Sequence, residues 1–338
     1  MFQSQKKLVM EYYAALDSCL ETGRSEAAFA SCSAFIGSEY RWRGYHPFNE
    51  INDYAKVYEE FWVPLKRSIV RMQRRQDIFM AGHNCVDSED DAVWVVSMGH
   101  LMGLFDKSWL GIAPTGRIVM FRYCEFNKVS DGKIVDTAMY FDIPHLMMQA
   151  GLQPFPQMTG AQLVQPGPNG HGGLLFETQP PEESEKTLDL INSMVSDVST
   201  WQKEVPIEEE LGRTWHDDMI WWGPTGIGAT YTIDRYVKQH SGVFRASFKD
   251  RTFNGHVCRM AEGHFGGFFG WPNLTLEATG GFMGMPATGK RADMRVIDIY
   301  RRDGEKLAEN WIFIDLLHFW KQQGLDILAR HKDLNETD

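Results

Sequence analysis

Residues 142–152 read DIPHLMMQAGL and residues 315–325 read DLLHFWKQQGL, so the pattern D-x-x-H-x-x-x-Q-x-G-L occurs twice in the chain. Each copy begins 26 residues after the glycine of a Thr-Gly pair, which is Gly116 in the first half and Gly289 in the second. A long pattern that recurs at a fixed distance from a second shared pair indicates an internal repeat. The two stretches therefore predict that the chain contains one structural unit twice.

The repeat extends towards the N-terminus of both stretches. An arginine follows each Thr-Gly glycine by six residues and an acid follows it by nine, and two Gly-His pairs precede it. The matched pairs are Gly82-His83 with Gly255-His256, Gly99-His100 with Gly263-His264, Arg122 with Arg295, and Glu125 with Asp298. The shared pattern G-H-x-x-G-x-F at 99–105 and 263–269 makes His100 the expected counterpart of His264.

The segment between the two copies is rich in proline and glycine. Residues 151–181 hold six of the 14 prolines and six glycines, which excludes a continuous helix or a central strand. We predict a first domain at 1–152, a linker at 153–183 and a second domain at 184–332.

Within each half, helical patterns precede strand patterns. Helices are expected at 8–20, 26–35 and 52–61 and again at 229–240, with a short helix after each repeated aspartate. Strands are expected at 39–45, 70–80, 92–104, 116–128 and 133–141, and then at 217–222, 250–260, 263–268, 274–281, 291–301 and 305–314. This order predicts an α+β fold in which a curved antiparallel sheet wraps around helices and leaves a cone-shaped cavity.

Composition limits the classes of function. The net charge of -11 argues against a nucleic-acid partner, because an acidic chain is repelled by phosphates. No apolar run is long enough for a spanning helix or a signal peptide, and the five scattered cysteines form no CxxC pair. We expect a cytoplasmic protein that has neither a disulfide framework nor a membrane partner.

The order of these motifs, which both halves share, resembles a known family. The residues that carry the resemblance are PTGR at 114–117 and TGKR at 288–291, each followed by the arginine, the acid, an Asp-Gly turn and the repeated aspartate stretch. They are similar to the end of a SnoaL-like polyketide cyclase domain, a member of the nuclear transport factor 2-like superfamily. The resemblance implies two cone-shaped α+β barrels that pair through their sheets as a pseudo-twofold internal dimer. It also implies that Asp142 and Asp315 act as general acid and base without a cofactor.

The repeated aspartates have two interpretations. Because alternate residues of a strand share a face, Asp315 shares a face with Trp311 and Phe313, and Asp142 shares one with Tyr140. A carboxyl group among aromatic side chains has a raised pKa that suits proton transfer. Alternatively each aspartate caps the helix that follows it, because Asp is a favoured N-cap residue.

Histidines are the second group of candidates. His145 and His318 lie three residues after the aspartates, so they could relay a proton or only stabilise the start of the helix. His100 and His264 are expected inside glycine-rich strands, where the glycines indicate either a nearby ligand or a bend in the sheet. His83 and His256 are expected to be structural.

Arg122 and Arg295 lie on the more apolar faces of their strands, so each needs an anionic partner from a substrate or from the other domain. Glu125 and Asp298 fall on the opposite face and are not expected in the same pocket. The spacing of the histidines fits no metal motif, so we predict no metal and no cofactor.

Together these residues favour a SnoaL-like acid/base enzyme of the cyclase, isomerase, dehydratase or hydrolase type. Its substrate would be a small carbonyl or hydroxy-acid compound, held by Arg122, Arg295, Tyr140, Trp311 and Phe313. Two alternatives remain open: a non-catalytic small-molecule-binding protein with two pockets, and an interaction scaffold. Besides the pairing of the two domains within the chain, further homodimerisation is left open.

Overall fold

The computed structural model of the chain describes residues 1–21, 26–87, 90, 92–200 and 205–335. Helices precede a run of long strands in the first half, as the sequence predicts. The elements of this half are α1 Gln3–Glu21, α2 Glu26–Ser33, β1 Ile36–Gly44, β2 Glu50–Ile51, α3 Tyr54–Val57, the π-helical turn η1 Tyr58–Trp62, α4 Val63–Ser68, β3 Ile69–His83, β4 Val93–Phe105, β5 Ile118–Ser130, β6 Lys133–Phe141 and α5 Ile143–Gln149.

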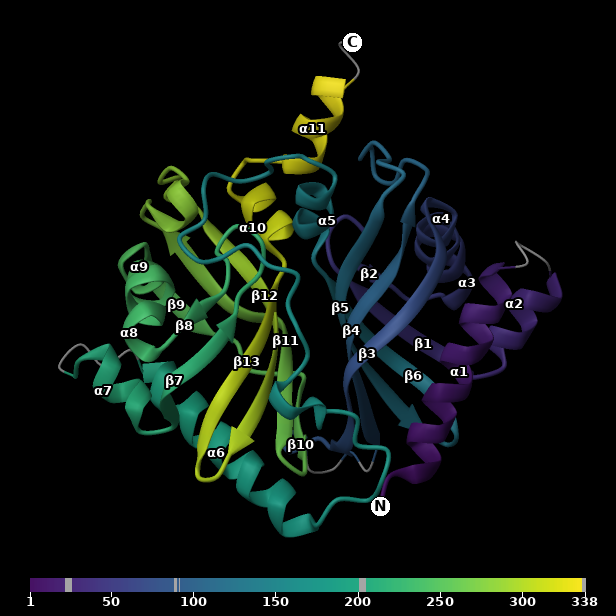
Figure 1. Cartoon of the computed structure of the whole chain (residues 1–338), viewed down its shortest axis with the longest axis horizontal. Coiled ribbons are helices and arrows are strands. Elements are labelled where there is room, and N and C mark those ends of the chain that lie inside the picture. The colour runs from purple at the N-terminus through teal and green to yellow at the C-terminus, as the bar shows by residue number, and fades with distance from the viewer. Residues whose placement is uncertain (22–25, 88–89, 91, 201–204, 336–338) are drawn as a thin grey trace.

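The second half repeats this order. After a short 3-10 turn in the linker, η2 Asn169–His171, its elements are α6 Pro181–Thr200, α7 Ile207–Gly212, β7 Trp215–Trp222, β8 Thr230–Tyr231, α8 Ile233–Tyr236, the π-helical turn η3 Val237–Ser241, α9 Gly242–Ala246, β9 Phe248–Phe253, β10 Cys258–Glu262, β11 Phe265–Ala278, η4 Phe282–Gly284, β12 Arg291–Asp303, β13 Lys306–Ile314, α10 Leu316–Gln322 and α11 Ile327–Asn335. Helix α11 projects from the body of the molecule (Figure 1).

Each half forms its own sheet. In the described part of the chain the orders are β2-β1-β6-β5-β4-β3 and β10-β11-β12-β13-β7-β8, with β9 paired to β11. All pairings are antiparallel except β1 with β6 and β7 with β13. The tight β5–β6 hairpin turns at Asp131 and Gly132, both at positive φ, which is why this turn has an Asp-Gly sequence. The α+β fold class is confirmed.

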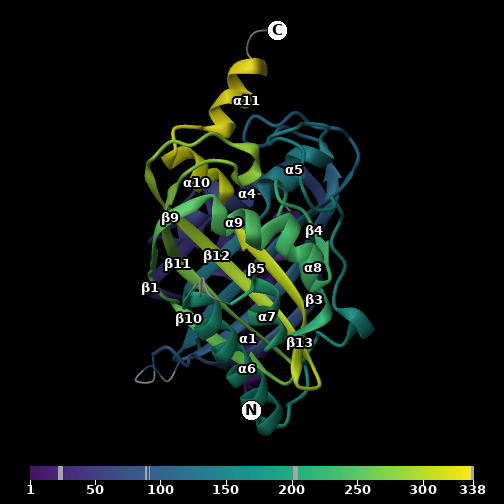
Figure 2. The ribbon, with the colours of Figure 1, turned by 90° about the vertical axis from the view of Figure 1, so that its left-hand side faces the viewer.

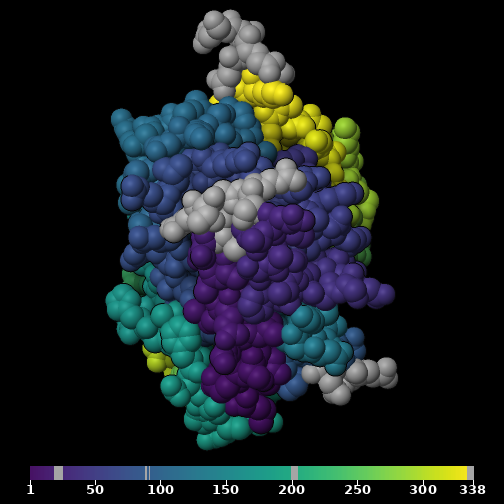
Figure 3. Space-filling model, turned by 90° about the vertical axis from the view of Figure 1, so that its right-hand side faces the viewer, coloured from purple at the N-terminus to yellow at the C-terminus, as the bar shows by residue number. Residues whose placement is uncertain are grey.

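The two sheets pack against each other through one face, and helices cover the opposite faces (Figure 1). At the centre, Phe269 of β11 contacts Trp94 of β4 and Phe126 of β5, with ring centroids 5.4 and 5.2 Å apart. Figure 2 shows α6–α9 in front of the second sheet, and Figure 3 shows the face of the first half that the N-terminal helices cover. The interior of each cone therefore lies between a sheet and its own helices, away from the contact between the halves.

The linker joins both halves along this contact. Ala161 forms a bridge with Ala229 in the second half, and Leu174 forms one with Phe79 of β3. Between them, the backbone nitrogen of Asn169 donates to Glu309 at 3.1 Å. Helix α6 begins at Pro181, so the irregular part of the linker ends slightly before the predicted residue 183.

Three predicted strands differ from the structure. The ranges 263–268 and 274–281 belong to one strand, β11, which stays continuous through a bulge between Gly270 and Leu274. The range 250–260 is divided into β9 and β10. Sequence alternation does not distinguish a bulge from a loop, since both interrupt the period of two. None of the helices in the described ranges has the length and apolar character needed to cross a membrane.

Candidate functional site

Asp142 caps α5 at the contact between the halves. Its Oδ1 accepts a hydrogen bond from the backbone nitrogen of His145 at 3.0 Å, and its Oδ2 accepts one from the backbone nitrogen of Thr225 in the other half, also at 3.0 Å. The side chain is buried and lies 3.8 Å from the guanidinium of Arg122. The capping interpretation thus describes its contacts, and one of these contacts joins the two halves.

Asp315 makes the reciprocal set of contacts. It caps α10 by accepting from the backbone nitrogen of His318 at 3.1 Å, and it accepts from the backbone nitrogen of His46 in the first half at 3.0 Å. Arg295 lies 3.4 Å away. Burial raises the pKa of Asp315 to about 6, against the opposing effect of Arg295.

The two arginines also cross the contact. Arg122 donates to the carbonyl oxygens of Trp222 and Ile312, at 3.1 and 2.7 Å, and stacks 3.8 Å above the ring of Phe313. Arg295 donates to Asn49 at 2.8 Å and stacks at the same distance on Trp271. Each arginine thus lies near an aspartate of its own half and donates to neutral oxygen atoms of the other half, whereas the sequence analysis expected an anionic partner from a substrate or from the other domain.

The aromatic residues predicted to bind substrate share this location. Tyr140 donates to the carbonyl oxygen of Gly270 at 2.9 Å, and the indole nitrogen of Trp311 donates to Pro166 of the linker at 3.1 Å. Together with Phe313, they lie on the faces through which the two sheets meet. The predicted shared faces are therefore correct, but these faces form the contact between the halves.

His100, His145 and His318 are also placed at this contact. His100 on β4 lies opposite Arg122 in the strand pairing, and its Nδ1 is 3.3 Å from Asp77. The ring of His145 lies 3.4 Å from the amide nitrogen of Gln149, while burial lowers its pKa and lowers that of His318 to about 3. In both helices the backbone nitrogen of the histidine, and not its ring, donates the hydrogen bond to the aspartate.

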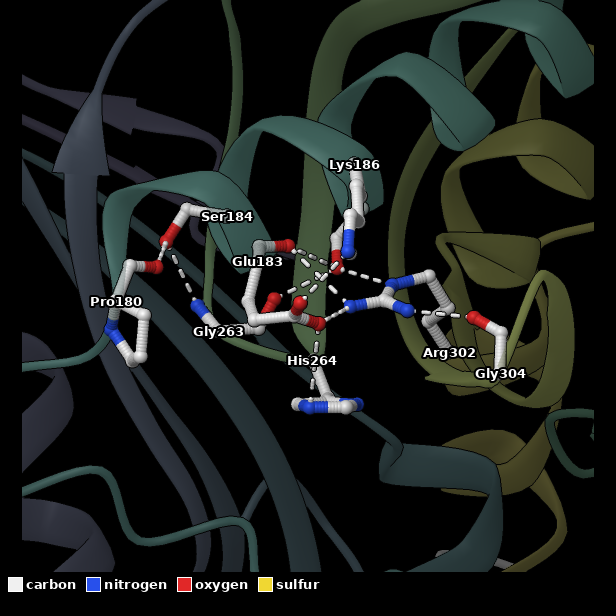
Figure 4. A network of polar contacts seen from close by, with 9 residues as sticks. Pro180, Glu183, Ser184, Lys186, Gly263, His264, Arg302 and Gly304 are labelled. Atoms are coloured by element: carbon white, nitrogen blue, oxygen red, sulfur yellow. Dashed lines mark hydrogen bonds and ion pairs between the residues drawn. The ribbon is translucent and has the colours of Figure 1, made fainter.

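His264 departs from the prediction. It lies in the turn that precedes β11, its side chain is 51% exposed, and it is 3.5 Å from Glu183. Figure 4 shows it in a polar network with Glu183, Lys186 and the buried Arg302 around the start of α6. The expectation that it lies inside a strand was wrong.

Strand pairing shows why the match with His100 was misleading. Gly99 pairs with Tyr123 one residue beyond Arg122, and Gly270 pairs with Val296 one residue beyond Arg295. Gly99 therefore corresponds to Gly270, and the counterpart of His100 is Trp271. The shared G-H-x-x-G-x-F pattern is a coincidence of composition in two glycine-rich strands.

A cavity of about 190 Å³ lies inside the cone of the second half. Its walls come from α6–α9, β9 and the inner face of the sheet, and they are mostly apolar and aromatic. The lining residues that matter below are Trp221, His240, Ser241, Asp298, Tyr300 and Asn310. None of the predicted site residues is among the described residues that line it.

Asp298 is the acid in this cavity. The amide nitrogen of Asn310 donates to its Oδ1 at 3.0 Å, and the phenol of Tyr300 forms a second hydrogen bond. Among the described residues no cation forms an ion pair with it, so burial dominates and raises its pKa to about 7. A carboxyl group with this pKa can both accept and donate a proton near neutrality.

The sequence analysis placed Asp298 on the face opposite Arg295 and did not expect the two residues in the same pocket; Asp298 lines the cavity and Arg295 does not. Both faces of β12 are largely buried, one against the other half and one inside the cone, so apolar character did not identify the cone side. The available signal was the polar cluster that Asp298, Tyr300 and Asn310 form on one face. The pairing of Tyr300 with Asn310 brings these side chains together.

Two histidines also line the cavity. His240 stacks on Trp221, with centroids 4.1 Å apart, and His256 stacks on Phe268 at 3.8 Å. Burial lowers the pKa of each to about 3, so both are neutral at physiological pH. They contribute aromatic surface, and Asp298 is the better candidate for proton transfer.

The matching position in the first half has another environment. Glu125 corresponds to Asp298 by its spacing, but Arg74 forms an ion pair with it at 3.1 Å. The π-helical turn η1 ends at Trp62 where η3 ends at Ser241, and Trp62 lies 5.5 Å from the Arg74 guanidinium. An arginine and an indole thus occupy the interior that is hollow in the second half.

The chain has two matches to a family model. Residues 82–150 and residues 272–323 match the SnoaL-like polyketide cyclase family. Each half therefore contains a SnoaL-like region. The match in the second SnoaL-like region includes Asp298 and Asn310, while the helices that close the cavity lie before it. No match was found among curated proteins.

Solved structures are similar to parts of the chain. An NTF2-like protein from Burkholderia thailandensis is 19% identical, covering 45% of this chain and 100% of its own, with a TM-score of 0.32. An NTF2-like protein from Burkholderia xenovorans is 10% identical over 41% of this chain and 97% of its own, with a TM-score of 0.34. TsrD from Streptomyces laurentii is 18% identical over 40% and 96%, with a TM-score of 0.31.

Proposed function

We propose that the protein is a cofactor-independent acid/base enzyme of the SnoaL-like type whose reaction takes place in the cavity of the second half. The observation that supports this most directly is Asp298, a buried carboxyl group that neutral hydrogen-bond donors hold at the wall of an apolar cavity. Groups with shifted pKa values in concave sites are typical of catalytic centres.

The substrate class follows from the walls of the cavity. Aromatic side chains such as Trp221 and Phe268 favour a small, flat and largely apolar molecule, and about 190 Å³ suits a compound of one or two rings. Asp298 requires a proton that it can remove, and the carbon next to a carbonyl group supplies the most acidic C–H bond in such a molecule.

The reaction step uses only this chain and the substrate. The ionised carboxylate of Asp298 takes the proton from the α-carbon, and the electron pair of the broken C–H bond forms the double bond of an enolate. The carbonyl oxygen then carries the negative charge. The protonated Asp298 returns the proton to a carbon or to an oxygen of the intermediate. Isomerisation and ring closure by aldol addition both follow from this step.

The interface aspartates have a structural role in this proposal. Asp142 and Asp315 cap helices and bind the backbone of the opposite half, so both carboxyl groups are occupied by N–H donors. Holding the two sheets together fixes the wall on which Asp298 lies. The first half supports the second and does not carry out the reaction.

A metabolite screen by thermal shift would test the proposal, with enzymatic turnover of each hit measured in four proteins. We expect Asp298→Asn to reduce turnover by roughly 10²- to 10⁴-fold, the usual contribution of a general acid or base. Asp142→Asn and Asp315→Asn should lower the melting temperature and retain turnover. If an interface variant abolishes turnover while Asp298→Asn does not, the active site is at the contact between the halves. Binding without turnover in any protein would indicate a binding protein.

A further inference from the structure

The end of β3 and the residues just after it run beside β10 across the contact between the halves. The backbone nitrogen of Ala81 donates to a side-chain oxygen of Glu262 at 2.7 Å. The backbone nitrogen of Arg259 donates to the side-chain oxygen of Asn84 at 3.1 Å. Residue numbers rise along one segment while they fall along the other, so the two segments are antiparallel.

This register brings two cysteines together. Cys85 directly follows Asn84, and Cys258 directly precedes Arg259, so Cys85 lies beside Cys258. The backbone nitrogen of Cys85 donates to the carbonyl oxygen of Arg259 at 2.9 Å, which holds the two backbones together at this point. Residues opposite each other on antiparallel segments have Cα atoms about 4.5–5.5 Å apart, which is within the range that a disulfide spans.

The side chain of Cys258 is directed towards the first half. Alternate residues of a strand share a face, and the buried residues of β10 are Cys258, Met260 and Glu262. Glu262 accepts the hydrogen bond from Ala81, and a Cβ atom added to Gly82 would lie only 2.9 Å from the side chain of Met260. The face of β10 that carries Cys258 is therefore turned towards the end of β3.

The two thiols differ in accessibility. Both are free, but Cys85 is exposed while Cys258 is buried. A dissolved reagent can therefore reach Cys85, whereas Cys258 can react only with a group that is already held beside it. Desolvation raises the pKa of both thiols, with Arg259 opposing this effect at Cys85. Because the thiolate is the nucleophile, thiol–disulfide exchange should be faster at mildly alkaline pH than at neutral pH.

We propose that Cys85 and Cys258 are a redox pair that cross-links the two halves in the presence of a small disulfide such as glutathione disulfide. The Cys85 thiolate attacks one sulfur of glutathione disulfide, so that a mixed disulfide forms and one glutathione thiolate leaves. The Cys258 thiolate then attacks the Cys85 sulfur, and the second glutathione thiolate leaves. Two protein thiols are oxidised, one glutathione disulfide is reduced to two molecules of glutathione, and these take up the two thiol protons.

The cross-link would make the contact between the halves depend on the redox state. It joins β10, at the edge of the second sheet, to the segment that follows β3, at the edge of the first sheet. A disulfide that closes so long a part of the chain stabilises the protein by restricting its unfolded state. The inference is independent of the proposed function, because it involves neither Asp298 nor a substrate.

Oxidation of the full-length protein with glutathione disulfide at mildly alkaline pH tests the redox pair. Mass spectrometry of an unreduced digest should identify the peptides of Cys85 and Cys258 joined to each other and free of glutathione. The oxidised protein should melt about 4 °C higher than the reduced protein, and dithiothreitol should reverse the shift.

Cysteine variants separate the two steps. Cys258→Ala should retain glutathione on Cys85 as a mixed disulfide, and Cys85→Ser should form no cross-link. Cys32→Ala removes another buried thiol of the first half and is the matched control, so it should cross-link as the wild type does. If Cys85 of the wild type stays reduced or retains glutathione and no cross-link forms, Cys258 does not reach it and the redox pair is rejected.

Discussion

The two halves of this chain share a fold but not an interior. In the first, Glu125 is neutralised by Arg74, whose guanidinium also lies 3.9 Å from the ring of Tyr13. In the second, Asp298 occupies the same strand position with an amide and a phenol as partners and an open cavity beside it. The same scaffold thus holds a buried carboxylate paired with an arginine in one copy and a buried carboxyl group with neutral partners in the other.

The difference shows which positions of the fold decide between a filled and a hollow cone. The ends of the two π-helical turns are decisive, because Phe61 and Trp62 in η1 correspond to His240 and Ser241 in η3. The faces through which the two sheets meet are alike, because each carries an aspartate and an arginine that contact the other half. A duplicated fold can therefore keep its mutual contact while the residues inside its two cones differ.

Filling the second cone should have the largest effect. Ser241→Trp places in η3 the residue that ends η1, and its side chain would occupy the cavity next to Asp298. We expect binding and turnover of the compounds found in the thermal-shift screen to become undetectable while the far-UV circular dichroism spectrum is retained. Ser241→Ala is the control, and it should bind as the wild type does. Retained binding in the Trp variant would show that the ligand site lies elsewhere.

Removing the ion pair of the first cone should affect stability alone. Arg74→Met leaves Glu125 buried without a cation, which typically costs about 3–5 kcal/mol of unfolding free energy. Urea unfolding would measure the loss, and the double variant with Glu125→Gln should recover part of it. Turnover should not change, because it takes place in the second cone. A parallel loss of activity in folded protein would assign catalysis to the first half.

The fold was largely predictable from the sequence, and the site was not. Strand periodicity predicted the sheets, and helix capping was one of the two interpretations of Asp142 and Asp315 in the repeated D-x-x-H stretch. Periodicity also showed that Arg295 and Asp298 lie on opposite faces of β12. It did not show which face is inside the cone, because a sheet packed on both sides is apolar on both sides.

The match between the Gly-His pairs of the two halves was wrong for another physical reason. A match of short glycine-rich patterns does not fix the strand register, and pairing with the next strand matches Gly99 with Gly270 and not with Gly263. His100 and His264 were therefore aligned although one is buried in a strand and the other lies in an exposed turn. The spacing of the acids from the Thr-Gly pairs was reliable because β5 and β12 pair with their next strands in the same way up to the terminal turn.

Asp298→Asn should be more stable than the wild type, and this gain should be smaller than the loss of stability expected for Arg74→Met. The folded pKa of about 7 lies above the ordinary value of 3.8, so the folded wild type binds more protons than the unfolded chain between these values. The unfolding free energy of the wild type therefore falls as the pH rises towards 7, and it stays lower above pH 7. Asn carries no charge at any pH. The variant should match the wild type near pH 4 and exceed its stability by roughly 2–4 kcal/mol above pH 7.

Urea unfolding at a series of pH values would measure this gap, because the other titrating groups are common to both proteins and cancel. Asp303→Asn, which changes an exposed carboxylate at the end of the same strand, is the control and should show a gap near zero throughout. A gap for Asp298→Asn that does not vary with pH would mean that the carboxyl group is not desolvated. The difference between Asp298 and the paired Glu125 would then no longer explain why only one cone is suited to acid/base chemistry. A gap that opens between pH 4 and 7 would show that the second half keeps a destabilising charge, as expected where function and not stability determines the residue.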